Sequence, residues 1–289
     1  MNPGTAINEE LRELSPPRSI GWAGLAARIE DIFVSLSLVI MAILPLAEAA
    51  LRRTLHVSIP ASTSIVQHMV LVVGMLGGAI AAREQRLLTL SNLGESSLRG
   101  RTKNISRMLT SAVSAVICGF LSLASFQFVQ TERDAAKILV FGIPIWVVEI
   151  VLPAGFAVIA LRILWHTSQN WRPRIAATVF ALFLGILVWQ WPATGHHFVG
   201  VALGVLFIVS LLGVPALVTL GGAALVLFWG VDQPIASIPV AHYALVINPT
   251  LPTLPLFALA GYFLAEGGAP RRLVRVFYAL FGQFRGGPA

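Results

Sequence analysis

The chain has 289 residues, of which 56% are hydrophobic and only 11% are charged, and its mean hydropathy is +0.81. These values exclude a soluble globular domain and predict a polytopic membrane protein. Apolar runs of about twenty residues favour helical spans over the shorter alternating segments of a β-barrel. A single cysteine, Cys118, excludes a disulfide within the chain and a thiolate metal cluster.

The net charge of +7 raises the question of a nucleic-acid partner. We exclude a nucleic-acid-binding protein because the arginines lie at the ends of apolar runs, where the positive-inside rule places them. Residues 1–30 contain acids, bases and the proline pair Pro16–Pro17 but no apolar core. They are therefore predicted to form a short cytoplasmic N-terminal tail rather than a signal peptide.

The rest of the chain predicts an all-α fold of about seven or eight transmembrane helices. The apolar runs fall at 32–51, 62–82, 105–130, 143–165, 175–191, 198–212, 214–230 and 235–265. The fifth, sixth and seventh runs are close to the shortest length that can span a bilayer, and the last run is interrupted by prolines.

Basic residues between the runs predict the orientation of the helices. With the N-terminus in the cytoplasm, the loops within 83–107 and 162–174 are internal and rich in arginine, whereas the external turn at 192–197 has no lysine or arginine. A single crossing by 235–265 would place the basic residues that follow it in the cytoplasm. A re-entrant hairpin, the alternative, would leave them outside.

The segment after residue 247 has prolines at intervals of three, at Pro249, Pro252 and Pro255. Each proline removes a backbone donor and disfavours helix at the preceding residue. At membrane depth the freed carbonyls need protein or water partners, and transporters place binding sites in such broken helices. The predicted ion or substrate path comprises Asn248, Thr250, Pro252, Pro255 and Gly261. Capping of a helix end by Asn248 and Thr250 is the alternative.

A second break at Gly267–Gly268 precedes Arg271, Arg272 and Arg275, which alternate with apolar residues in an amphipathic pattern. The pattern predicts a C-terminal helix at the membrane interface, in contact with lipid. It could serve as a plain surface anchor or as an arm that braces neighbouring helices.

Two polar residues interrupt otherwise apolar spans. Glu149 is an acid near the middle of a predicted span, where it could be a proton or ion site or could form a buried hydrogen bond to a neighbouring helix. His68 lies on a mostly apolar helix, where an interhelical hydrogen bond is the simpler interpretation than a ligand role.

The proline-broken tail resembles the beginning of the large M subunit of TRAP (tripartite ATP-independent periplasmic) transporters. The resemblance rests on Asn248, Leu251, Pro255, Phe257, Leu259-Ala260-Gly261, Gly267-Gly268-Ala269, Arg271-Arg272 and Gly286-Gly287. Pro252 and Thr253 depart from the family, which has apolar residues there. Gly213-Val214-Pro215 is similar to the G-x-P that follows the first span of M.

The opening helices resemble the small Q subunit of the same transporters. The matching residues are the basic loop Ala81–Arg86, Gly142-Ile143-Pro144-Ile145-Trp146 and Leu152-Pro153-Ala154-Gly155. The family often has a histidine where this chain has Arg86. Four spans return the chain to the cytoplasm, whereas M starts outside, so a fusion needs one additional crossing. The predicted domains are accordingly the tail 1–30, a Q-like four-helix scaffold 31–170, a linking helix 171–195 and an M-like portion 196–289.

The resemblance implies a component of a secondary transporter in the bacterial inner membrane. Sodium is the implied coupling ion, an organic acid the implied cargo, and a periplasmic substrate-binding protein and the remainder of M the implied partners. The Gly-Ser-Ser hairpins that hold ion and substrate residues in the family do not occur in this sequence. We therefore expect a truncated product or a fragment whose remainder is encoded separately.

Two other classes stay open. A membrane scaffold or assembly protein without transport activity follows if the rest of M is never supplied. An intramembrane enzyme would need Glu149 and His68 to face one cavity. The sequence has no nucleotide-binding G-x-x-x-x-G-K-[ST] motif and no catalytic or metal-ligand constellation, so we predict no catalytic residue, metal site or cofactor.

Overall fold

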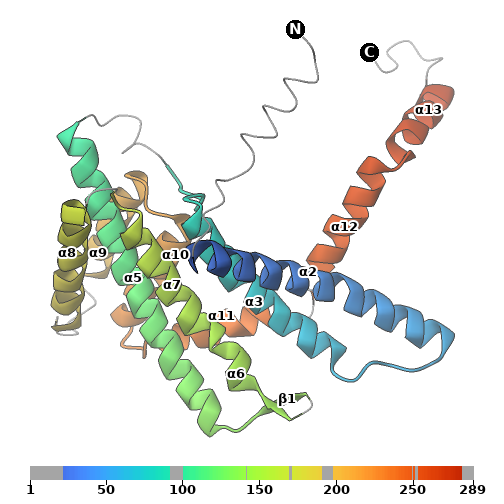
Figure 1. Ribbon diagram of the computed structural model, residues 1–289, viewed down its shortest axis with the longest axis horizontal. Helices are drawn as coiled ribbons and strands as arrows, with labels where there is room; N and C mark the ends of the chain where they lie inside the picture. The colour runs from blue at the N-terminus through green and yellow to red at the C-terminus, as the bar shows by residue number, and fades with distance from the viewer. Residues whose placement is uncertain are drawn as a thin grey trace.

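The computed structural model describes residues 22–91, 100–140, 142–168, 171–190, 198–248, 250 and 253–281, and Figure 1 shows them to be largely helical. The helices are α2 (Trp22–Thr54), α3 (Ser62–Arg83), α5 (Arg101–Asp134), α6 (Ile145–Glu149), α7 (Val151–Trp165), α8 (Trp171–Gln190), α9 (Val199–Leu211), α10 (Ala216–Gly230), α11 (Ser237–Val246), α12 (Thr253–Glu266) and α13 (Ala269–Phe281). A short antiparallel ladder pairs β1 (Ile138–Val140) with β2 (Ile143–Pro144). The predicted all-α class is confirmed.

Five helical segments in the described part of the chain are long and apolar enough to cross a membrane. They are α2, α3, α5, the α6–α7 pair and α8. The helices α9 to α12 are apolar but shorter. The 13 residues of α9 rise only about 20 Å, less than the hydrocarbon core of roughly 30 Å. The predicted interruption of the last apolar run is present, because residues 247–252 separate α11 from α12.

Two helices extend beyond the apolar runs that predicted them. Helix α2 begins at Trp22, so residues 22–30 of the predicted tail are helical. Helix α5 has 34 residues and rises about 51 Å, well beyond the apolar run at 105–130. An apolar run marks the thickness of the hydrocarbon layer, whereas backbone hydrogen bonding carries the helix on into polar sequence.

Helix α5 is the central helix, with the largest buried share among the candidate spans. It packs along α7 and α8, while α3 packs on α7 and α2 packs on α3 (Figure 1). The hairpin of α9 and α10 and the short α11 also lie against α5. Two apolar clusters hold this arrangement: Leu71, Met75, Leu121, Phe128 and Leu152 form most of one, and the other joins Cys118 and Ile159 to Val209, Val214 and Val218.

The division between α6 and α7 has a backbone cause. Pro153 has no N–H to donate to the carbonyl of Glu149, four residues earlier, and the helix divides at Ile150 between them. The carbonyl of Pro153 accepts a hydrogen bond from the hydroxyl of Ser122 on α5, at 2.8 Å. Gly155 then allows a close approach to α3, because a Cβ there would lie 2.6 Å from Cε of Met75.

One end of the bundle contains a network of charged groups. The Arg162 guanidinium of α7 contacts the carboxylate of Glu30 on α2 and donates to the Ala79 carbonyl of α3 at 2.7 Å. Arg83 of α3 lies 3.1 Å from Glu30 and 2.8 Å from Asp31. Glu30 and its two arginines are each about one-fifth exposed. The network ties three helices together and holds the first part of α2 against α3 and α7.

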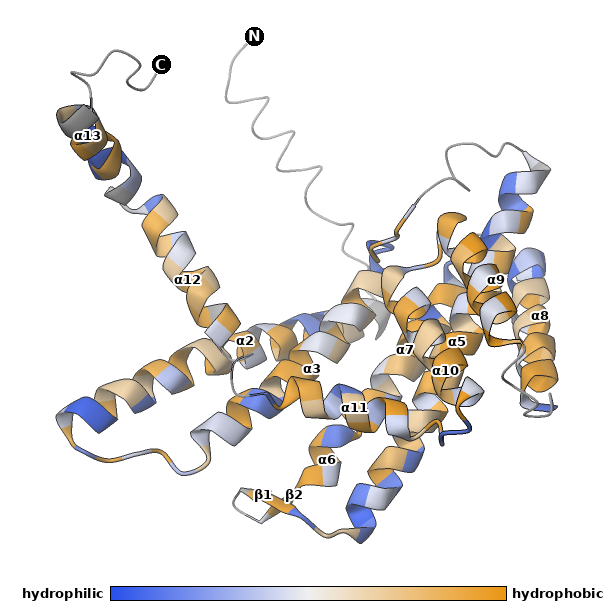
Figure 2. Cartoon of the chain, turned by 180° about the vertical axis from the view of Figure 1, so that it is seen from behind, coloured by the Kyte–Doolittle hydropathy of each residue, from blue (hydrophilic) through white to orange (hydrophobic). Residues whose placement is uncertain are grey.

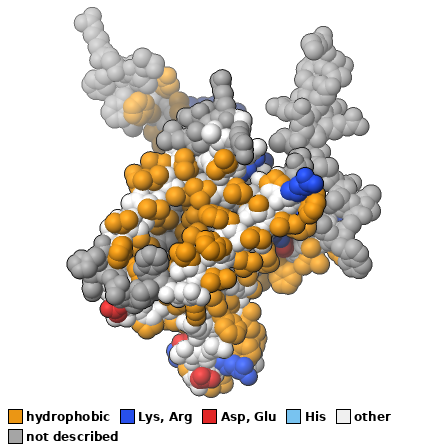
Figure 3. Space-filling model, turned by 90° about the vertical axis from the view of Figure 1, so that its left-hand side faces the viewer, with side chains coloured by type: hydrophobic (Ala, Val, Ile, Leu, Met, Phe, Trp, Pro, Cys, Tyr) orange, Lys and Arg blue, Asp and Glu red, His pale blue; other side chains and the backbone are white. Residues whose placement is uncertain are grey.

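Apolar side chains face outward over much of the surface. Figure 2 shows apolar residues along the outer faces of the helices and hydrophilic residues gathered at several helix ends. Figure 3 shows one face of the molecule that is mostly apolar, with charged groups toward its edges. Leu182, Phe183 and Ile186 of α8, each more than half exposed, belong to this outward-facing set. Such a surface is suited to a bilayer, where helices satisfy their own backbone groups.

Candidate functional site

The predicted path residues surround the break between α11 and α12. The side-chain oxygen of Asn248 accepts hydrogen bonds from the backbone N–H of Thr250 at 3.0 Å and from its hydroxyl at 2.8 Å. This is the local turn that asparagine favours, so both side chains form hydrogen bonds within the turn that follows α11. Pro252 lies outside the described residues.

Pro255 is a correction to the predicted break. It lies in the first turn of α12, which begins at Thr253. The first N–H groups of a helix have no acceptor within the helix, so a proline there costs no hydrogen bond. The interruption is therefore confined to residues 247–252. Gly261 lies within α12, and a Cβ added there would have no described atom within 4 Å apart from its chain neighbours and the backbone of its own helix.

The predicted arm helix is α13, separated from α12 at Gly267–Gly268. Arg271, Arg272 and Arg275 are exposed on it. Its apolar residues are also exposed, including Leu273 at 71%. In Figures 1 and 2 the two helices project away from the rest of the molecule. Both faces of α13 are thus available to lipid or to further protein.

His68 and Glu149 approach a common neighbour, Tyr243 of α11. The His68 ring lies 2.7 Å from the Ser64 carbonyl through Nδ1 and 2.8 Å from the Tyr243 hydroxyl through Nε2. Because a carbonyl can only accept, Nδ1 carries the proton and Nε2 accepts from the phenol. The Tyr243 ring also packs 5.5 Å from that of Phe128 on α5.

Glu149 is fully buried, and neither of its carboxyl oxygens has a hydrogen-bond partner among the described residues. Tyr243 is close enough to interact with it electrostatically, although the pair does not meet hydrogen-bond geometry. The phenol donates to His68 and so has no proton left for the carboxyl. The structure therefore brings the two predicted polar residues to one tyrosine, which the sequence patterns alone did not single out. The adjacent His242 and Tyr243, polar residues within an apolar stretch, were the available signal.

The contact between His68 and Tyr243 connects the beginning of α3 to α11. A second connection between distant segments lies at the other end of α3. The segment after this helix runs beside the turn between α9 and α10: the N–H of Ala216 donates to the Leu88 carbonyl at 2.7 Å, and Thr89 forms an antiparallel bridge with Pro215. Gly213 occupies this turn with φ of +116°, a conformation that a residue with a side chain rarely adopts. The two connections are separated by most of the length of α3.

Comparison with known proteins gives two consecutive matches. Residues 41–173 match the family described as tripartite ATP-independent periplasmic transporters, DctQ component, and residues 203–289 match the corresponding DctM component. A C4-dicarboxylate TRAP transporter large permease protein, DctM, of Vibrio cholerae serotype O1 is 36% identical over 94 residues, which cover 30% of this chain and 21% of that protein. The chain belongs to the TRAP transporter family.

The predicted resemblance to both Q and M subunits is therefore confirmed, with the Q part (residues 41–173) before the M part (residues 203–289). Helix α8 lies largely between the two matched segments. The polar cluster around Tyr243 and the bridge at Pro215 both join these parts. In the first, His68 and Gln67 of the Q part bond to Tyr243 and to the Ile247 carbonyl of the M part. The TRAP chain thus packs its two parts against each other at both ends of α3.

Proposed function

We propose that the chain is the fused Q–M membrane component of a sodium-driven TRAP transporter that takes up a C4-dicarboxylate delivered by a periplasmic substrate-binding protein. The observation that carries the proposal is the presence of both family matches in one chain. The relative in Vibrio cholerae, named as a C4-dicarboxylate permease, supports the substrate class.

The packing supports a division of labour between the two parts. Helices α3, α5 and α7 interlock through apolar clusters, and the Glu30 network ties α2 to α3 and α7, as a stationary frame requires. Helices α12 and α13 leave large apolar side chains uncovered, such as Phe257 at 72% and Phe263 at 65%. These surfaces are suited to the remainder of the M subunit, which would carry the sodium and substrate sites, with Asn248 and Thr250 at its leading edge.

Charge distribution supports an inner-membrane orientation with a cytoplasmic N-terminus. Arg83, Arg86, Arg162 and Arg174 follow or precede spans at what would be the cytoplasmic side. The break at 247–252 then lies within the membrane region, where α11 and α12 together make the last crossing. The arginines of α13 would lie at the cytoplasmic interface.

Reconstitution tests the proposal. The chain, continued into or co-expressed with the remaining large-subunit sequence, is placed in liposomes with its substrate-binding protein outside, and uptake of labelled succinate is followed. We expect uptake only with an inward sodium gradient. When potassium replaces sodium, or when the binding protein is omitted, uptake should fall to the level measured with empty liposomes. The chain by itself is the control for the contribution of the added sequence.

Two results would count against the proposal. Uptake that is equal with sodium and potassium gradients would contradict sodium coupling. Binding of all components without uptake of any dicarboxylate would favour the second candidate, a scaffold that assembles the complex without transporting. The packed Q part is the observation that keeps this candidate open, since a frame can be built without a pathway.

A further inference from the structure

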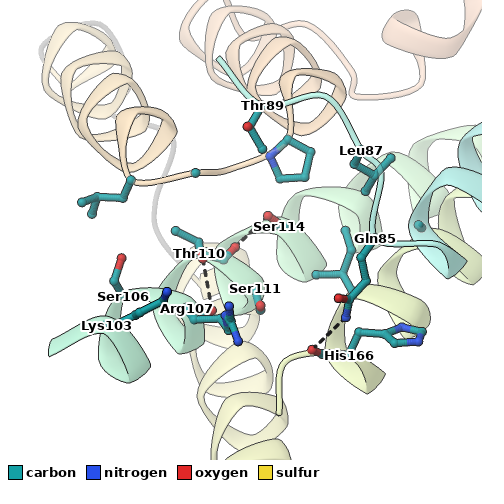
Figure 4. A pocket seen from close by; sticks show the side chains of 15 residues that line it. Gln85, Leu87, Thr89, Lys103, Ser106, Arg107, Thr110, Ser111, Ser114 and His166 are labelled. Carbon is teal, nitrogen blue, oxygen red and sulfur yellow. Dashed lines mark hydrogen bonds between the residues drawn. The ribbon is translucent and has the colours of Figure 1, made fainter. Parts of the chain in front are cut away.

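A cavity of about 340 Å³ lies at the Pro215 connection between the Q and M parts. Figure 4 shows it between the first turns of α5, the end of α7, the segment after α3 and the turn between α9 and α10. The cavity therefore occupies a seam to which four segments contribute.

The lining is basic and rich in hydroxyl groups. Lys103 and Arg107 of α5 and His166 at the end of α7 lie around the cavity, and no acidic residue lines it in the described part of the chain. Lys103 forms no ion pair with any described residue, and it is only partly exposed. A cation without a carboxylate neighbour in a partly enclosed cavity indicates a site for an anion.

Two hydroxyl groups differ in their availability. The Thr110 hydroxyl donates its proton to the Arg107 carbonyl of the same helix at 3.1 Å, so this proton is not available to a ligand. Ser106 is 7% exposed, and no described residue forms a hydrogen bond with its hydroxyl. One turn of helix separates Ser106 from Lys103. Together they offer a donor and a cation to the same ligand, the combination that a phosphate oxygen pair accepts.

The position of the cavity favours a lipid over a free anion. It lies where the apolar run of α5 begins, the level at which headgroups meet a membrane protein. Leu88 and Ile105, sequence neighbours of lining residues, are 83% and 53% exposed. Large apolar side chains beside an anion site are suited to acyl chains, and basic pockets between membrane helices are known to take anionic headgroups.

We propose that this cavity binds the phosphate headgroup of an anionic phospholipid, held by Lys103 and Ser106 at the seam between the Q and M parts. The lipid would fill a space that the protein leaves between them. The proposal does not depend on sodium coupling or on the identity of the transported acid.

Lipid binding to the purified chain tests this directly. The delipidated protein in detergent is titrated with dioleoylphosphatidylglycerol or dioleoylphosphatidylcholine, and bound lipid is counted by native mass spectrometry. We expect preferential binding of phosphatidylglycerol. Lys103→Gln should weaken this binding about fivefold, the effect of roughly one basic residue near an anionic lipid. Lys103→Arg should restore it.

Matched controls separate the alternatives. Arg53→Gln removes one positive charge from an exposed position at the end of α2, outside the cavity, and should leave lipid binding unchanged. Circular dichroism checks that each variant keeps its helices. Inorganic phosphate should fail to displace the lipid. Displacement by phosphate would instead indicate a free-anion site, and binding of phosphatidylcholine as tight as that of phosphatidylglycerol would show no preference for an anionic headgroup. Either result would overturn the proposal. Equal effects of Lys103→Gln and Arg53→Gln would overturn it too.

Discussion

Glu30→Ala is expected to lower the free energy of unfolding of the detergent-solubilised protein by about 3 kcal/mol, the lower end of the range for breaking a largely buried ion pair. The substitution removes the carboxylate that Arg162 and Arg83 share. Among the described residues, Arg162 would keep the Ala79 carbonyl as its partner, and Arg83 would keep Asp31, Glu84 and the Ala27 carbonyl. Chemical denaturation followed by circular dichroism measures the change.

The control for this prediction is an exposed pair on the same end of the molecule. Arg86 is 81% exposed and lies 4.0 Å from Glu84, so Arg86→Ala is expected to change stability by less than about 0.5 kcal/mol. Glu30→Gln keeps the side-chain volume, and the free energy of unfolding that it costs should lie between the losses from Glu30→Ala and Arg86→Ala. A loss from Glu30→Ala as small as that from Arg86→Ala would show that the network does not hold α2, α3 and α7 together.

Tyr243→Ala is expected to detach α11 from the Q part. The Tyr243 side chain forms the hydrogen bond to His68 and packs on Phe128 and its apolar cluster. Its removal should therefore lower the free energy of opening of α11 by about 3 kcal/mol. Tyr243→Phe removes only the hydroxyl and should cost about 1 kcal/mol. Hydrogen–deuterium exchange of residues 237–247 measures the local opening, because exchange reports the free energy of each opening segment.

An exposed tyrosine provides the matched control. Tyr262 on α12 is 61% exposed and has Phe263 as its aromatic neighbour. Tyr262→Ala should leave exchange of 237–247 as it is in the parent protein. If Tyr243→Ala also left it unchanged, α11 would be held by other contacts and the polar cluster would have no part in joining the two halves.

Local sequence patterns predicted the helices well where local physics decides. Apolar runs located the long spans, and the prolines before Thr253 and the glycine pair at Gly267–Gly268 marked both interruptions of the tail. Pro255 was misplaced because the same residue that breaks a helix interior is well tolerated in a first turn. The start of α2 was missed because residues 22–30 follow a charged stretch that contains prolines and include the charged Arg28 and Glu30, so the whole of 1–30 looked like a solvated tail.

Long-range pairing was beyond a single sequence. Arg162 and Glu30 are 132 residues apart, and His68 and Tyr243 are 175 apart. Periodicity indicates which face of a helix is apolar, but it does not say which other helix covers that face. The polar cluster and the lipid cavity both arise where the Q and M parts meet, so neither could be located before the fold was known.

The most direct test of the account asks whether the Q and M parts pack against each other as one body. Thr89 and Pro215 form an antiparallel bridge, a pairing with Cα atoms about 4.5 to 5.5 Å apart, which a disulfide can span. The pair Thr89→Cys and Pro215→Cys is introduced with Cys118→Ala, and a protease site is inserted after Ala193. After mild oxidation in native membranes and cleavage, the two fragments are separated by electrophoresis.

The account predicts that the fragments remain joined until a reductant is added. Thr89→Cys with Val231→Cys is the control, since Pro215 and Val231 lie at opposite ends of α10, about 24 Å apart along the helix. This control pair should give separate fragments under oxidising conditions. Separation of the Thr89 and Pro215 fragments without reductant, or cross-linking as efficient for the control pair, would contradict the packing of the two parts.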